Sequence, residues 1–248
     1  MVRLKTIQAS AFRTVFEVLK DIINDINLVF RPDGLLVVTL DTARVTLVHM
    51  FMPAENFEEY TCDRECTAGL NVSNTYKLLK SVTNTDTLTM SIDDQYLLNI
   101  QVENIAKKSC TSFQFRLLDI NDEMLSVPEI EMNILTTIPS VDFQRIVRDM
   151  HNLGSDIIIQ RSRGTLELSC EGGFANQKTV IECVETGPTR TLGNVFSLKY
   201  INMFTRATSL CSSVQIMQHA TDENMPIVFR YSIANLGELK FYLAPKVE

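Results

Sequence analysis

Pairs of basic residues recur in four stretches of the chain whose apolar residues follow a helical period. Residues three, four or seven positions apart lie on one side of a helix, so each pair would present two cations on one face. Such faces suit sequence-independent contact with a phosphate backbone, where charge rather than base-edge chemistry supplies the affinity. The pairs are Arg13 with Lys20, Lys77 with Lys80, Arg145 with Arg148, and Lys199 with Arg206.

The same pairs also fit a second interpretation, in which each is an ordinary solvated helix face. Acidic neighbours favour this interpretation for any single pair; they are Glu17, Asp21, Asp142 and Asp149. Four pairs in four helices of equivalent pattern favour phosphate contact instead. The residues alone leave both interpretations open.

Apolar spacing and turn residues predict the elements that carry these pairs. Each quarter of the chain, about 60 residues long, is predicted to hold one helix and several strands. The predicted helices are 10–25, 73–82, a helix capped by Ser140 that stops at Gly154, and 197–209. The predicted strands are 2–8, 26–30, 35–40, 44–51, 57–62, 66–71, 86–92, 96–102, 111–117, 133–138, 156–160, 165–169, 178–184, 212–218, 226–232 and 237–243.

An acidic linker at residues 118–133 separates two halves that share this order of elements. It holds five acidic residues and no basic residue, and Pro128 removes one backbone donor within it. Its apolar residues follow neither a helical nor a strand period, so we predict an extended connection. The predicted domains are therefore 1–117 and 134–248, on either side of the linker.

Composition limits the class of protein. A hydrophobic content of 45% with 21% charged residues is typical of a globular chain. No apolar run approaches the ~20 residues of a membrane-spanning helix, and the first ten residues lack the core of a signal peptide. The net charge is −7, and because the acidic linker holds much of the excess, each half is nearly neutral. Six scattered cysteines favour a reducing compartment.

Residue types and spacing do not indicate catalysis or a bound cofactor. Cys62 and Cys66 form the closest cysteine pair, but no nearby histidine completes a metal set, so we expect no metal. The three histidines show neither metal-ligand nor triad spacing, and Gly172 and Gly173 fall in an ordinary turn rather than a phosphate-binding loop. We therefore predict a protein that is not an enzyme, with no catalytic residue and no cofactor.

Several segments carry a family resemblance. PSVDFQRIVRDMHNLGSDIII, YINMFTRATSLCSSV and ANLGELKFYLAPKVE resemble the eukaryotic DNA sliding clamp, the proliferating cell nuclear antigen (PCNA) family, which includes viral and divergent members. In the first half VFEVLKDIIN, LDTARVTLVHM and YTCDRE do so as well. The resemblance runs from end to end without large gaps, and the LAPK ending is its most specific motif.

The resemblance implies an α+β fold of two similar DNA-clamp domains, each with two helices packed on curved antiparallel sheets. It implies a homotrimeric ring whose helices, with the four basic pairs, surround double-stranded DNA. The implied function is that of a processivity factor, which tethers DNA polymerase, a clamp loader and other proteins that carry a short interaction motif. The implied location is the nucleus, or a replication compartment for a viral member.

The resemblance also implies a partner pocket beneath the linker and two edge strands at the subunit interface. The pocket residues are Leu40, Arg44, Val45, Leu47, Leu125, Val127, Pro128, Pro226, Tyr242, Leu243, Ala244 and Pro245. Such a pocket holds a few apolar anchors within a polar rim, and the acids of the linker favour partners with basic flanking residues. The edge strands are 109–117, with Phe113, Phe115 and Leu117, and 178–186, with Val180 and Ile181.

The sequence departs from the family pattern at two places. Arg44 replaces a histidine that is usual in animal clamps, so partner preferences can differ. Residues Arg161, Ser162, Arg163 and Gly164 replace a turn that carries a modifiable lysine in many eukaryotic clamps, which argues against ubiquitin signalling there. Three alternatives remain: a checkpoint-type heterotrimer subunit, a monomeric viral processivity factor, and a protein-docking module that forms no ring.

Overall fold

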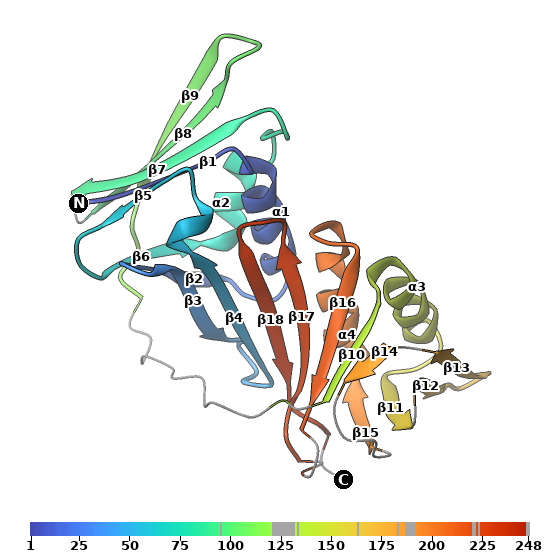
Figure 1. Cartoon of the computed structure of the whole chain (residues 1–248). Helices are drawn as coiled ribbons and strands as arrows, with labels where there is room; N and C mark the ends of the chain where they lie inside the picture. The colour runs from blue at the N-terminus through green and yellow to red at the C-terminus, as the bar shows by residue number, and fades with distance from the viewer. Residues whose placement is uncertain are drawn as a thin grey trace. The chain divides into compact units, whose positions relative to one another are not determined.

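The computed structural model of the chain describes residues 1–94, 96–120, 132, 134–162, 164–182, 184–186, 192–219, 222 and 224–246 (Figure 1). The predicted residues Leu125, Val127, Pro128 and Arg163 lie outside these ranges. The chain forms two compact units. Unit 1 comprises residues 1–39, 48–126 and 232–239, and unit 2 comprises residues 40–47, 127–231 and 240–248. Each unit places two α-helices against antiparallel strands, so the α+β prediction is confirmed.

Unit 1 contains a five-stranded antiparallel sheet in the order β5-β1-β7-β8-β9, and a second run in the order β4-β3-β2-β6. The strands are β1 (Val2–Thr6), β2 (Asp25–Arg31), β3 (Gly34–Leu40), β4 (Thr46–Pro53), β5 (Glu59–Cys62), β6 (Cys66–Asn71), β7 (Thr87–Asp94), β8 (Leu97–Asn104) and β9 (Ser109–Arg116). The α-helices are α1 (Ala9–Leu19) and α2 (Val72–Leu79), and a short 3-10 helix, η1, spans Ala54–Asn56.

Helix α1 buries the stripe that its spacing predicts, with Phe12 and Phe16 no more than 2% exposed. It ends at Leu19, six residues before the predicted end. The Ile22 and Ile23 amides both donate to the Leu19 carbonyl there, and this turn leads into β2.

Helix α2 begins at Val72 because the side chain of Asn71 accepts a hydrogen bond from the Asn74 amide at 3.0 Å. Its buried positions are Val72, Thr75 and Leu79. Leu78 was predicted to point inward, but it is 37% exposed because it lies beside this stripe rather than within it.

Unit 2 contains a four-stranded antiparallel sheet in the order β13-β12-β11-β15, and a second run in the order β14-β10-β16-β17. Its strands are β10 (Ile134–Pro139), β11 (Asp156–Ser162), β12 (Thr165–Glu171), β13 (Asn176–Glu182), β14 (Val184–Thr186), β15 (Leu192–Ser197), β16 (Ser213–Gln218), β17 (Ile227–Ile233) and β18 (Gly237–Leu243). The helices are α3 (Ser140–His151), α4 (Leu198–Phe204) and the 3-10 helix η2 (Thr205–Ser209).

Aromatic side chains join the helices of unit 2 to its strands. Phe204 of α4 stacks on Phe241 with ring centroids 4.5 Å apart, and Phe143 of α3 stacks on Phe229 at 5.6 Å. All four side chains are fully buried, so each contributes a large apolar area to the core. This packing fixes the faces that α3 and α4 leave exposed.

Three local predictions for unit 2 were wrong. Residues 178–184 do not form one strand, because β13 pairs with β12 whereas β14 pairs with β10. Strand β15 was missed because Gly193 resembles a turn residue; in the sheet it lies opposite Gln160, whose side chain leaves no room for a Cβ. Ser140 is the first residue of α3 rather than its cap, and its hydroxyl donates to the Cys211 carbonyl at 2.6 Å.

Candidate functional site

The basic pair on α1 of unit 1 is held by α2 and the turn after it. The guanidinium of Arg13 donates to the Val82 carbonyl at 2.9 Å. The ammonium of Lys20 lies 4.8 Å from the ring centroid of Tyr76, within range of a cation–π contact, and 3.9 Å from Asp21. Both cations are therefore only partly exposed and contribute to helix packing as well as to surface charge.

Helix α2 exposes the other basic pair of unit 1. Lys77 and Lys80 are both exposed, and the Lys77 ammonium reaches only the Asn74 side-chain oxygen, at 3.3 Å. Neither α2 lysine is printed against a carboxylate, so both positive charges face solvent. This is the arrangement that contact with a polyanion requires.

The basic pairs of unit 2 also lie on exposed helix faces. Arg145 and Arg148 project from α3, where Arg145 pairs with Asp142 at 3.4 Å across one helical turn. An exposed pair of this kind contributes little to stability and can exchange partners. Lys199 is exposed on α4, whereas Arg206, also exposed, lies in η2.

Contacts between α3 and the segment around η2 hold these two faces in register. The Gln144 side chain donates to the Thr205 carbonyl at 2.9 Å, and the Thr208 hydroxyl donates to the Ser140 carbonyl. Unit 2 therefore presents four cations, as unit 1 does, on a pair of helices that pack together.

Two strands present free edges in the described part of the chain. Strand β9 is the last strand of its sheet, and Phe113 and Phe115 lie opposite the fully buried Ile100 and Leu98 of β8. The two phenylalanine side chains share the core face, yet they are only half-buried, because no further strand covers them. Leu117 follows the end of β9 and is also half-buried.

Strand β13 is the corresponding edge of the four-stranded sheet of unit 2. Ile181 lies opposite the buried Leu166, so it faces the core side. Val180 points to the opposite face and is 56% exposed. The predicted edge at 178–186 is thus corrected to β13, Asn176–Glu182, because residues 184–186 pair with β10.

Residues predicted to line the partner pocket gather in unit 2 around a loop at residues 41–46. Leu40, Val45 and Leu47 are half-buried, and the Ala244 amide donates to the Val45 carbonyl at 3.3 Å. Pro226, Tyr242 and Pro245 are also half-buried, and Arg44 and Ala244 are exposed. Leu243 is fully buried, so it supports the surface from within the core instead of lining it.

Asp41 fixes the conformation of this loop. One of its carboxylate oxygens accepts from the Val45 and Thr46 amides at 2.8 and 2.7 Å, and the other accepts from the Tyr200 hydroxyl at 3.2 Å. Burial, and then the charge of Asp41, raise the pKa of Tyr200, so the hydroxyl stays protonated and donates. Arg44 adopts a left-handed backbone (φ 57°), which this bonding holds in place.

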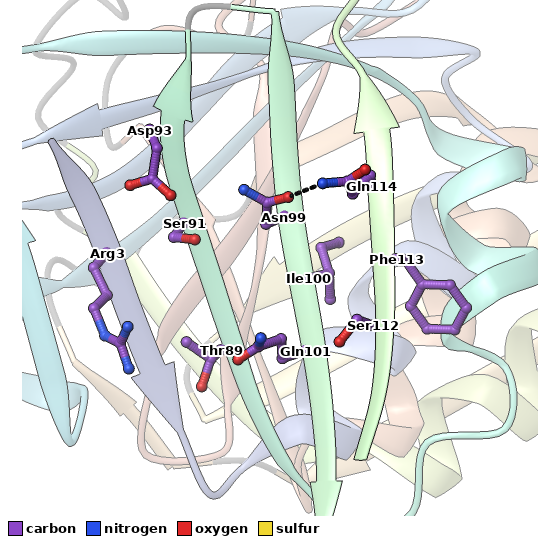
Figure 2. A pocket seen from close by; sticks show the side chains of 10 residues that line it. All are labelled: Arg3, Thr89, Ser91, Asp93, Asn99, Ile100, Gln101, Ser112, Phe113 and Gln114. Carbon is purple, nitrogen blue, oxygen red and sulfur yellow. Dashed lines mark hydrogen bonds between the residues drawn. The ribbon is translucent and has the colours of Figure 1, made fainter.

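A polar hollow of ≈ 610 Å³ lies on the outer face of the five-stranded sheet of unit 1 (Figure 2). Its walls are mainly amides and hydroxyls, such as Asn99, Gln101 and Ser112, and the Gln114 amide donates to Asn99 at 3.2 Å. Its cation, Arg3, pairs with Glu59 at 3.2 Å and holds the pKa of that carboxyl below its usual value, together with Lys5. The hollow lacks the apolar walls that aromatic anchors need.

Comparisons with known proteins place the whole chain. Residues 1–124 match the family model of the proliferating cell nuclear antigen N-terminal domain, and residues 126–246 match that of its C-terminal domain. The chain belongs to the proliferating cell nuclear antigen family. It is also 32% identical over 253 residues to the probable DNA polymerase sliding clamp 1 of Paramecium bursaria Chlorella virus 1, a match that covers 98% of this chain and 95% of that protein.

Membership of the PCNA family confirms the relationship predicted from the sequence and supports a DNA polymerase sliding clamp function. The PCNA family acts as a non-catalytic processivity factor. Among the described residues, no group of histidine, cysteine and acidic side chains is arranged to hold a metal ion. Within the same ranges, no helix is long and apolar enough to span a membrane.

Sequence reasoning missed the residues that position these PCNA surfaces. Asp41 and Tyr200 are 159 positions apart, and no periodic pattern links them. Tyr76 was treated as an ordinary helical residue, although it holds the Lys20 ammonium. The Asp41-Thr42 pair before Arg44 was a usable signal, because aspartate commonly accepts hydrogen bonds from backbone amides a few residues on.

The Arg13 contact predicts an asymmetry among the basic residues. Replacing Arg13 with alanine removes the bond to the Val82 carbonyl and should lower the free energy of unfolding by about 1.5 kcal/mol or more. Replacing the exposed Arg148 with alanine should leave it unchanged within about 0.5 kcal/mol. Differential scanning calorimetry of both variants tests this, and equal melting temperatures for the two would contradict the packing role of Arg13.

Proposed function

We propose that three copies of this chain close into a ring around double-stranded DNA and tether a DNA polymerase to it. The observation that carries the proposal is the pair of free strand edges, β9 in unit 1 and β13 in unit 2. Each edge lies in a different unit, so β9 of one copy can pair with β13 of the next. A head-to-tail contact of this kind generates a closed ring when its rotation closes.

Burial supports the pairing of these two strands. A strand edge carries a row of unpaired amides and carbonyls, and proteins normally cover such edges or pair them. Phe113 and Phe115 share the core face of β9, and Ile181 lies on the core face of β13. Joining the strands would continue both core faces and complete the burial of all three side chains.

The proposed DNA contact is electrostatic and independent of sequence. Lys77, Lys80, Arg148 and Lys199 are exposed on the helices, and their charge would attract phosphates. Arg145 pairs with Asp142, and Arg13 and Lys20 are engaged in packing, so we assign these three a weaker share. Such a surface steers a duplex without gripping it, and retention then depends mainly on the closed ring.

The proposed partner site is the surface around the 41–46 loop in unit 2. Leu40, Val45, Leu47, Pro226 and Tyr242 are half-buried there, as the walls of a shallow apolar site would be. A short peptide with one aliphatic and two aromatic anchors would fill it, and Ala244 to Lys246 would offer backbone groups. The acidic linker, with Leu125, Val127 and Pro128, would complete the site.

The remaining assignments follow from the same role. A closed ring needs a clamp loader to open it, so we include a loader among the partners. We place the protein in the nucleus or a viral replication compartment, and we propose that it catalyses no reaction. A checkpoint-type heterotrimer or a monomeric factor would differ in oligomer mass and in the pairing of the β9 and β13 edges.

Replacing Phe113 with glutamate should convert the trimer to monomers at micromolar concentration, because a charge would enter the core face of the joined sheet. Native mass spectrometry or sedimentation measures the change directly. The matched control is Ile105→Glu, since Ile105 is 84% exposed in the turn before β9. A wild-type monomer, or a Phe113→Glu variant that stays trimeric, would refute the edge assignment.

Replacing Tyr242 with alanine should weaken binding of a partner peptide. Loss of a central buried contact typically costs about 2 kcal/mol, which is roughly thirtyfold in affinity. A labelled peptide with the three anchors gives the dissociation constant, and Tyr96→Ala serves as the control because Tyr96 is 75% exposed in unit 1. Unchanged affinity in the Tyr242 variant would place the site elsewhere.

Replacing Lys77, Arg148 and Lys199 together with glutamine should reduce loading onto DNA while the trimer persists. The salt dependence of DNA association should also flatten, by up to about 0.9 in log–log slope for each lost phosphate contact. The control variant neutralises Arg64, Lys107 and Lys108, which are exposed but lie outside the helices. Equal loss of loading in both variants would show that only net charge matters, contrary to the helix assignment.

A further inference from the structure

The first residues of the acidic linker are attached to unit 1. The Leu118 amide donates to the Gly69 carbonyl at 2.8 Å, and the two residues form an isolated antiparallel bridge. Gly69 belongs to β6, the last strand of its run, so Leu118 occupies the free edge of that strand. One residue earlier, the Leu117 amide donates to the Tyr96 carbonyl at 3.0 Å.

The contact requires glycine at position 69. A Cβ at this position would lie 2.2 Å from the Leu118 carbonyl oxygen, a distance that no real contact shows. It would also lie 3.1 Å from the terminal methyl group of Ile120. Because one of these neighbours is backbone, a side chain here would displace the linker itself.

A second bond fixes the direction of the linker. In the register of β2 and β6, Asn27 lies directly opposite Gly69. The Asn27 amide donates to the Ile120 carbonyl at 3.2 Å, so the linker passes from the edge of β6 towards β2. Asp119 lies between these two attached residues, and its side chain is exposed.

We propose that Gly69 and Asn27 are positioning residues for partner docking, because they fix where and in which direction the acidic linker leaves unit 1. This rests on the proposed function, in which the linker forms part of the peptide site. A linker with a fixed origin loses less conformational freedom when a peptide binds, so the attachment strengthens binding. It also holds Asp119 at a defined place, where a basic residue flanking the peptide anchors can pair with it.

Two variants test the attachment in the assembled protein. Gly69→Ala inserts the clashing Cβ, and Asn27→Ala removes one hydrogen bond without a clash. We expect peptide affinity to fall about tenfold in Gly69→Ala and about threefold in Asn27→Ala, because linker order must then be gained on binding. Gly173→Ala is the control, because a Cβ at Gly173 meets no atom within 4 Å.

Hydrogen exchange separates positioning from a general loss of structure. The Leu118 amide should exchange faster in both variants, whereas oligomer mass, melting temperature and exchange in β11 and β12 should match the wild type. If Gly69→Ala fails to fold, Asn27→Ala carries the test alone. A variant with fast Leu118 exchange and wild-type peptide affinity overturns the positioning role, and so does a Leu118 amide that exchanges freely in the wild type. A wild type that binds no peptide overturns the proposed docking function itself.

Discussion

Unpaired backbone groups along β9 and β13 are the constraint on which the account of this protein depends. Each strand is bonded on one side only in the described ranges, and each carries apolar side chains that its own unit buries only in part. Strand pairing between copies would satisfy the amides and carbonyls and bury those side chains in one step. A ring follows from this pairing because the two edges differ and belong to different units.

The ring resolves a conflict in the charge of the chain. A protein with a net charge of −7 should be repelled by DNA at long range, yet eight basic residues lie on or beside its helices. The structure divides these residues into two groups. Arg13 and Lys20 connect α1 to α2 or the turn after it, whereas Lys77, Lys80, Arg148 and Lys199 remain at the surface. The exposed group is small enough that topological retention, rather than affinity, explains how such a clamp would stay on DNA.

Much of the fold was predictable because apolar periodicity records burial. The stripes of α1, α3 and α4 bury the residues that their spacing selects, and the hairpins form at the predicted turns. Errors arose where tertiary contacts decide the outcome. Leu78 is exposed although it fits an apolar pattern, and β15 forms although Gly193 resembles a turn residue.

The positions of the basic pairs on helices could be predicted, since helix faces follow from spacing alone. The residues that hold the surfaces in place could not, because their partners are distant in sequence. Asp41 meets Tyr200 across 159 positions, and Gly69 meets Leu118 through a backbone contact that leaves no side-chain signal. A glycine within a predicted strand indicates a close approach, but it does not identify which segment approaches.

The central claim is that the protein holds DNA by encircling it, and the lifetime of the loaded protein on two DNA substrates tests this most directly. Loaded protein should persist far longer on circular duplex than on linear duplex of the same length and sequence, because only free ends allow a closed ring to slide off. Blocking the ends of the linear duplex with bound protein should restore the long lifetime. Equally fast loss from circular and open linear DNA would contradict the account.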